Sequence, residues 1–145
     1  MAQVKSTLTE SLLFESGIIK RRAELLPKST VSDYFSGLEQ EYGYSVFSTV
    51  YHVEWNGKKA KDNLNCPGSD DFVGAAITAL NVTDTAILLL NGQYGPEVGT
   101  QNHFRYTEKL GKPVIFLVNQ LDNEKCDYDN VLEQLRSIYG SKVVP

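Results

Sequence analysis

The sequence has little of what marks secreted, disulfide-stapled or membrane-spanning proteins. It holds two cysteines, Cys66 and Cys126, among 145 residues, too few for a disulfide framework, so a reducing compartment is expected. Its longest apolar runs, at 86–90 and 114–118, are far shorter than the ~20 residues that cross a bilayer. No basic segment followed by an apolar one opens the chain. We therefore expect a cytoplasmic protein without membrane association.

An excess of positive charge is also missing. Fourteen Lys and Arg against eighteen Asp and Glu leave a net charge of -4, so general polyanion binding is not expected and any nucleic-acid contact would be local. Repeats and low-complexity segments are absent, and 41% hydrophobic with 22% charged residues is ordinary for a globular protein. The length of 145 residues predicts a single domain over 1–145.

What the sequence does contain is an alternation of helical and strand-like segments. The segments expected as helices are 6–19, a stretch capped by Ser69 with a buried stripe of Phe72, Ala75, Ala76 and Leu80, 97–110 and 127–139; those expected as strands are 45–55 and 58–65 around Asn56–Gly57, a fully buried 85–90, and 113–118. This alternation predicts an α/β fold with a mostly parallel sheet and helices on both faces. Strand 58–65 conflicts with that pattern, because Ala60 and Leu64 are its only apolar residues.

Ligands of such sheets bind where the strands end, and three short motifs are expected there. Lys5–Ser6 at a helix start is typical of a phosphate loop, in which Lys and backbone N–H groups hold phosphate and the hydroxyl holds Mg²⁺; the alternative is a capping Ser beside a solvated Lys. Pro67–Gly68 is either a turn or a close approach of backbone N–H to phosphate. Asn119 and Asp122 form either a turn or a guanine site, because a carboxylate can accept both N–H donors of the guanine edge.

Together these motifs resemble the G domain of translational GTPases, above all elongation factor G and its bacterial paralogues. The segment 38–45, LEQEYGYS, is similar to the family's switch-one motif M-E-Q-E-x-x-R-G-I-T. The segment 65–72, NCPGSDDF, resembles the switch-two motif D-T-P-G-H-V-D-F, and 119–122, NQLD, resembles the base motif N-K-M-D. The resemblance covers nearly the whole chain and implies a P-loop NTPase-like fold.

The resemblance also implies the roles of individual residues. Those implied for phosphate are Lys5, Ser6, Thr7 and Gly68; for Mg²⁺, Ser6 and Ser45; and for guanine, Asn119, Gln120 and Asp122. The implied ligands are GTP or GDP with Mg²⁺, and the implied partner is the ribosome. An RNA contact by Lys20–Arg22 is an alternative to a solvated helix end.

Four positions depart from the family pattern. Val4 stands where the phosphate loop has its second Gly, and Asn65 where an Asp supports Mg²⁺. Ser69 replaces the His that positions the attacking water, and Gln120 replaces the Lys that packs along the base. The resemblance with these departures predicts a guanine-nucleotide domain acting in translation, with weakened Mg²⁺ binding and little or no hydrolysis.

Several further expectations follow from the resemblance. The family's first strand and last base-contacting loop have no counterpart in the sequence, so the G domain is expected to be incomplete and prone to aggregate. The rival hypothesis is a pseudo-GTPase interaction fragment that binds no nucleotide.

Metal binding by His52 or His103 is not expected, because no Cys or carboxylate stands at a ligand spacing from either.

Overall fold

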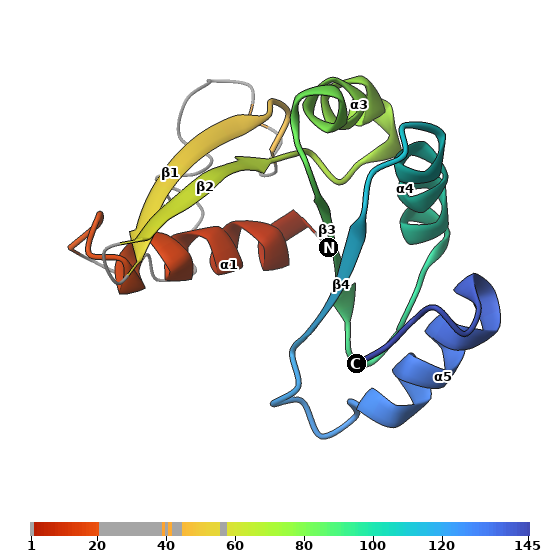
Figure 1. The fold of residues 1–145 in the computed structure, drawn as a ribbon. Helices are drawn as coiled ribbons and strands as arrows, with labels where there is room; N and C mark the ends of the chain where they lie inside the picture. The colour runs from red at the N-terminus through yellow and green to blue at the C-terminus, as the bar shows by residue number, and fades with distance from the viewer. Residues whose placement is uncertain (1, 21–38, 40, 42–44, 56–57) are drawn as a thin grey trace. The chain divides into compact units, whose positions relative to one another are not determined.

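A computed structural model describes residues 2–20, 39, 41, 45–55 and 58–145 (Figure 1). The chain divides into two compact units, Met1–Ala79 and Leu80–Pro145, called unit 1 and unit 2 below. The turn predicted at Asn56–Gly57, the basic pair Arg21–Arg22 and most of the switch-one motif lie outside the described residues. The expectation of one domain over 1–145 stays a prediction.

Unit 1 contains an antiparallel hairpin. Strands β1 (Thr49–Trp55) and β2 (Lys58–Asn65) pair from Thr49 opposite Asn65 to Trp55 opposite Lys58, which confirms the predicted hairpin, although β1 begins at Thr49 rather than Ser45. The polar sequence of β2 is compatible with this pairing because the ladder uses main-chain groups only. Among the described residues β2 pairs with β1 alone, and polar residues are common in strands that pair on one side.

Helix α1 (Ala2–Glu15) lies beside the hairpin in unit 1 (Figure 1). Its Leu13 forms a buried cluster with Tyr51 and Val53, against which Ile19 packs. The helix ends before the predicted Ile19 because Gly17 takes a left-handed conformation with φ of 76°. The N–H groups of residues 18 and 19 then turn back to the Leu13 carbonyl at 3.1 and 3.3 Å.

The chain next forms a 3₁₀ turn, η1 (Asp70–Phe72), and helix α3 (Val73–Val82). Ser69 starts this turn as predicted: its carbonyl accepts the Phe72 N–H at 3.1 Å, and its Oγ accepts the Asp71 N–H at 3.4 Å. The predicted buried stripe is only partly right. Ala76 is buried, but Phe72, Ala75 and Leu80 are half-buried and Ala79 is the second buried residue of α3.

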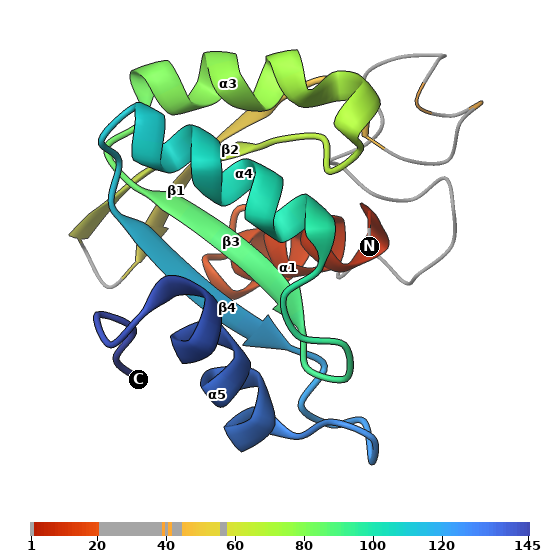
Figure 2. The same cartoon turned by 90° about the vertical axis from the view of Figure 1, so that its right-hand side faces the viewer.

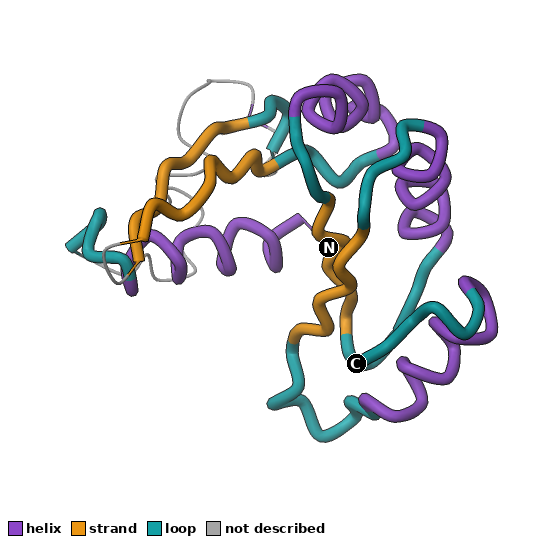
Figure 3. The backbone as a smooth tube through the Cα atoms, in the orientation of Figure 1, coloured by secondary structure: helices purple, strands orange, loops and turns teal. Residues whose placement is uncertain are grey.

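Unit 2 is built on two parallel strands, β3 (Ala86–Asn91) and β4 (Val114–Asn119), which run side by side in Figure 3. Helices α4 (Val98–Lys109) and α5 (Tyr128–Tyr139) follow them, within one residue of the predicted bounds. Helix α5 is capped by Asp127, whose Oδ1 accepts the Asn130 N–H at 3.0 Å. The predicted parallel pairing is thus confirmed in unit 2.

Both helices of unit 2 lie on the same face of β3 and β4 (Figures 1 and 2). The core on that face consists of Leu90, Val131 and Leu135, with Phe116, Val118, Tyr139 and Val143 packed around it. On the opposite face Ile87 and Ile115 are paired across the strands and are 54% and 52% exposed. The prediction of a fully buried strand at 85–90 is therefore wrong at Ile87, because both helices of the unit cover the other face.

An aromatic cluster joins α4, β4 and α5. The ring of Tyr139 lies 4.2 Å from that of Phe104 and 5.1 Å from that of Phe116, centroid to centroid. Its hydroxyl is buried and has no hydrogen-bond partner among the described residues. Burial raises the pKa of the Tyr139 phenol, Arg105 lowers it and Glu108 raises it.

We expect Tyr139→Phe to leave the free energy of unfolding unchanged or to raise it by about 1 kcal/mol, because the hydroxyl is desolvated without a partner. A second effect should appear above pH 10. The unfolded phenol ionises there while the folded one, with its raised pKa, stays protonated, so wild-type stability falls as pH rises and the variant lacks this loss. Urea unfolding at pH 7 and above pH 10 measures both; a less stable variant at pH 7 would contradict the prediction.

Candidate functional site

Two of the predicted phosphate residues meet in unit 1. The ammonium group of Lys5 donates a hydrogen bond to the carbonyl of Cys66 at 2.6 Å. It also lies against Gly68, since a Cβ built there would stand 2.5 Å from Lys5 Nζ. Only glycine leaves the ammonium this room without a shift. The structure therefore brings Lys5 to the loop that follows β2, from 61 residues away in the sequence.

The start of α1 differs from the sequence expectation. The helix begins at Ala2, so Lys5–Thr7 follow its first turn and the N–H groups of Ser6 and Thr7 are used inside the helix. Val4 is helical and has no positive φ, so it lacks the strain that a β-branched residue would have in a left-handed glycine position. Ala and Gln favour the helix here and valine, unlike glycine, does not interrupt it. The phosphate role of these residues stays a prediction.

The hydroxyl residues predicted for Mg²⁺ are both buried: Ser6 is 5% exposed and Ser45 6%. The segment after Ser45 is held by Glu39, whose buried Oε1 accepts the N–H groups of Val46 and Phe47 at 2.9 and 3.0 Å. We assigned no role to Glu39 from the sequence, although it stands in the switch-one motif. A buried carboxylate that accepts two main-chain donors is a strong local anchor.

The two substituted positions around the Pro67–Gly68 loop belong to the elements on either side of it. Asn65 ends β2 opposite Thr49 and is half-buried. The Ser69 hydroxyl donates to the carboxylate of Asp71 at 3.3 Å and so belongs to the 3₁₀ turn. Ser6, Ser45 and Asn65 offer two hydroxyls and one carboxamide but no carboxylate, whereas Mg²⁺, a hard cation, is held in proteins by carboxylates, phosphates and water.

The predicted base-recognition residues lie in unit 2, in the loop after β4. Gln120 has a left-handed conformation with φ of 62°, rare for a residue other than glycine. Its N–H donates to Asn119 Oδ1 at 2.8 Å, and its side-chain Oε1 accepts from Asn91 Nδ2 at 2.5 Å. Asp122 is exposed, and none of the described residues donates a hydrogen bond to its carboxylate. This carboxylate is therefore open to an outside donor.

The loops after β3 and β4 approach each other closely. The Gly92 N–H donates to the Asn119 carbonyl at 2.9 Å, and a Cβ on Gly92 would collide with the Cys126 sulfur. Asn91, Gly92 and Cys126 are thus part of this loop pair, a site role that the sequence does not predict for any of them. The Asn-Gly pair after an apolar strand was visible there, but it is also an ordinary turn signal.

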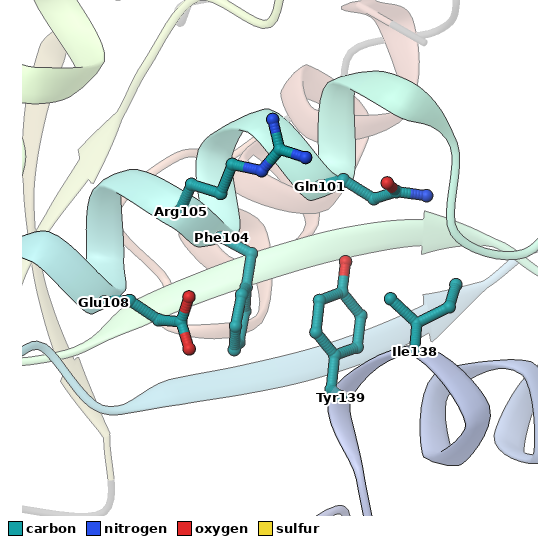
Figure 4. A pocket seen from close by; sticks show the side chains of 6 residues that line it. All are labelled: Gln101, Phe104, Arg105, Glu108, Ile138 and Tyr139. Carbon is teal, nitrogen blue, oxygen red and sulfur yellow. The ribbon is translucent and has the colours of Figure 1, made fainter.

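The other features of the described residues give less support for a functional site. A pocket of about 280 Å³ between α4 and α5 includes none of the predicted site residues (Figure 4); its lining is Gln101, Phe104, Arg105, Glu108, Ile138 and Tyr139. Within the described part of the chain, no three His, Cys, Asp or Glu side chains gather to hold a metal ion. His52 pairs with Glu54 at 3.8 Å. No helix of the described ranges has the length and apolar character needed to cross a bilayer.

Comparison with known proteins gives the fold and the motifs a family. Residues 3–144 match the family model of the elongation factor Tu GTP-binding domain. The chain is 32% identical over 141 residues to an elongation factor G-like protein of Thermotoga maritima and 30% identical over 140 residues to the tetracycline resistance protein TetM of Enterococcus faecalis. These alignments cover 97% of this chain but 20% and 22% of the relatives, so it spans about a fifth of their length.

A crystal structure of a Thermus thermophilus protein superposes with a TM-score of 0.88 at 33% identity, over 95% of this chain and 20% of that one. The match extends over both strand pairs and confirms the predicted P-loop NTPase-like class of fold. The family model matches residues 3–144, nearly the whole chain, so the chain belongs to the elongation factor Tu GTP-binding domain family.

Proposed function

We propose that this chain binds guanine nucleotide and reads the base with Asp122. The observation that carries the proposal is the exposed Asp122 carboxylate, which no described residue engages, on a loop fixed by the hydrogen bonds of Asn119 and Gln120. A carboxylate held there accepts from N1–H and N2–H of guanine and has no such donor pair to meet on adenine. Family membership supports the same assignment.

The loop of unit 1 supports phosphate binding by charge. Lys5 and Gly68 are in contact, so the ammonium group brings a positive charge to the Pro67–Gly68 backbone. Ser6, Thr7 and Ser45 supply hydroxyl groups, whereas Asn65 supplies no charge for Mg²⁺. We therefore propose GTP or GDP as ligand with weak Mg²⁺ dependence.

The same residues argue against efficient hydrolysis. Ser69 stands where the resembled motif has His, and its hydroxyl already bonds Asp71. A short hydroxyl so engaged cannot orient a water molecule for attack on a phosphate. We propose a role in translation, on the ribosome and in the cytoplasm, in which nucleotide binding matters more than turnover.

A second candidate is an interaction fragment that binds no nucleotide. The helical Val4 and the early start of α1 favour it, because a phosphate loop needs free N–H groups where this chain has helix. The two candidates differ in whether the purified chain binds GDP at all. Titration with a fluorescent GDP analogue, with and without Mg²⁺, separates them.

Asp122→Asn should exchange the base preference of the chain. Wild type should prefer GDP to ADP, and the variant should lose GDP and gain xanthosine diphosphate, because an amide can donate to the second exocyclic oxygen of xanthine. Each change in binding free energy should be about 1–3 kcal/mol, the cost of leaving a polar group unpaired between the bound base and the protein. Competition titrations with the three nucleotides measure it. Equal binding of GDP and ADP by wild type would refute base recognition.

Asn65→Asp should strengthen Mg²⁺-dependent nucleotide binding by about tenfold. This is the lower end of the change in metal affinity caused by residues that contact a metal's ligands rather than the metal itself. Affinity in EDTA should not rise, because the added charge acts through the cation. Asn63→Asp, two positions earlier on β2 and exposed, adds the same charge and serves as the control. An equal gain in both variants, or a gain in EDTA, would contradict a Mg²⁺ site at this strand end.

GTP hydrolysis by the chain should stay at background even with ribosomes present, since Ser69 replaces the water-positioning His. Phosphate release is the measurement, and Lys5→Ala is the control for adventitious activity. Ribosome-stimulated release that Lys5→Ala abolishes would show that the chain is a working GTPase.

A further inference from the structure

Asn91 and Gln120 stand at the ends of neighbouring strands and are joined by their side chains. β3 and β4 pair in register up to Asn91 opposite Asn119, so the residue after Asn119 begins the next loop beside Asn91. Asn91 Nδ2 donates to Gln120 Oε1 at 2.5 Å. Both residues are half-buried, which shields this contact from water.

The direction of the hydrogen bond is fixed by a second contact. Asn91 Oδ1 accepts the main-chain N–H of Gln93 at 2.8 Å, and a main-chain N–H can only donate. The oxygen end of the Asn91 amide must therefore face Gln93, which leaves its NH₂ end to face residue 120. Position 120 is consequently required to carry a hydrogen-bond acceptor.

The backbone of Gln120 also fixes the turn that contains Asp122. Gln120 has a left-handed backbone conformation, which residues other than glycine rarely adopt. Its carbonyl accepts the Asn123 N–H at 3.1 Å, which closes the turn containing Asp122. Gln120 thus connects Asn91 to the carboxylate proposed to read the base.

We propose that Asn91 is a positioning residue for the base-recognition loop and that it makes glutamine, not lysine, the functional residue at position 120. The inference rests on the proposed binding of guanine nucleotide. The resembled base motif has Lys where Gln120 stands, but a lysine has three donors and no acceptor. With lysine at position 120, its ammonium group would face the Asn91 NH₂ group, and neither donor would have an acceptor. Restoring the family residue alone therefore weakens the site.

The test is a mutant cycle on the full chain, read by GDP affinity. Gln120→Lys should lower GDP affinity about tenfold, which corresponds to about 1.4 kcal/mol. Asn91→Asp alone should lower GDP affinity less than Gln120→Lys does, because the carboxylate still accepts from Gln93 and the Gln120 amide can rotate to donate to it. The double variant Asn91→Asp with Gln120→Lys should recover wild-type affinity, because Asp accepts from Lys. Gln101→Lys on α4 makes the same exchange outside the loop and should change nothing.

Rescue by the double variant separates positioning from a general loss of stability, which a second substitution would deepen. If Gln120→Lys binds GDP as well as wild type, or if the double variant binds no better than Gln120→Lys, the proposal is overturned.

Amide hydrogen exchange without nucleotide provides a readout independent of binding. Gln120→Lys should speed exchange at the amides of residues 120 and 123, and the double variant should restore their protection. If wild type binds no GDP, the proposed function fails and exchange alone decides whether Asn91 positions the loop. Unchanged protection in Gln120→Lys would then overturn that role.

Discussion

The in-register parallel pairing of β3 with β4 is the constraint on which unit 2 depends. It places Asn91 opposite Asn119, so two polar loops leave the sheet at the same edge while Leu90, Phe116 and Val118 face α4 and α5. A slip of one residue would turn those side chains to the opposite face and move Gln120 away from Asn91. The core and the loop geometry therefore have a common cause: burial of the apolar residues sets the register, and the register sets the loops.

The loop pair shows how a departure from a motif can be compensated nearby. Gln120 is not simply a missing lysine, because its Oε1 satisfies the Asn91 NH₂ group and its backbone closes the turn to Asp122. Asn119 contributes its side chain to the Gln120 N–H and its carbonyl to the Gly92 N–H. A half-buried network of this kind is stable only when its members are matched donor to acceptor, so its residues cannot be judged one at a time.

Most helices and strands of the fold could be predicted from the sequence, and the predictions that were wrong have physical reasons. The hairpin, the parallel strands and the bounds of α4 and α5 follow from local pattern, since period-2 and period-3.6 spacing acts within a few positions. The exposed Ile87 does not follow, because an apolar run of six residues shows neither which face a helix covers nor how many helices share it. Helix α1 begins at Ala2 rather than at the predicted Ser6, because the helix propensity of Ala2 and Gln3 extends it beyond the Lys5–Ser6 motif.

The same distinction applies to the site. Lys5 and Gly68 were predicted as separate motifs, and their contact needed the structure, because nothing in the sequence specifies a pairing over 61 residues. The sequence predicts no anchoring role for Glu39 or Asn91, because each acts through main-chain or side-chain hydrogen bonds that leave no periodic signal. Such partners fix where the neighbouring groups of each loop stand, and Glu39 keeps the residue of the resembled switch-one motif. The geometry of a degenerate motif therefore depends on its hydrogen-bond partners as well as on the number of consensus residues that it keeps.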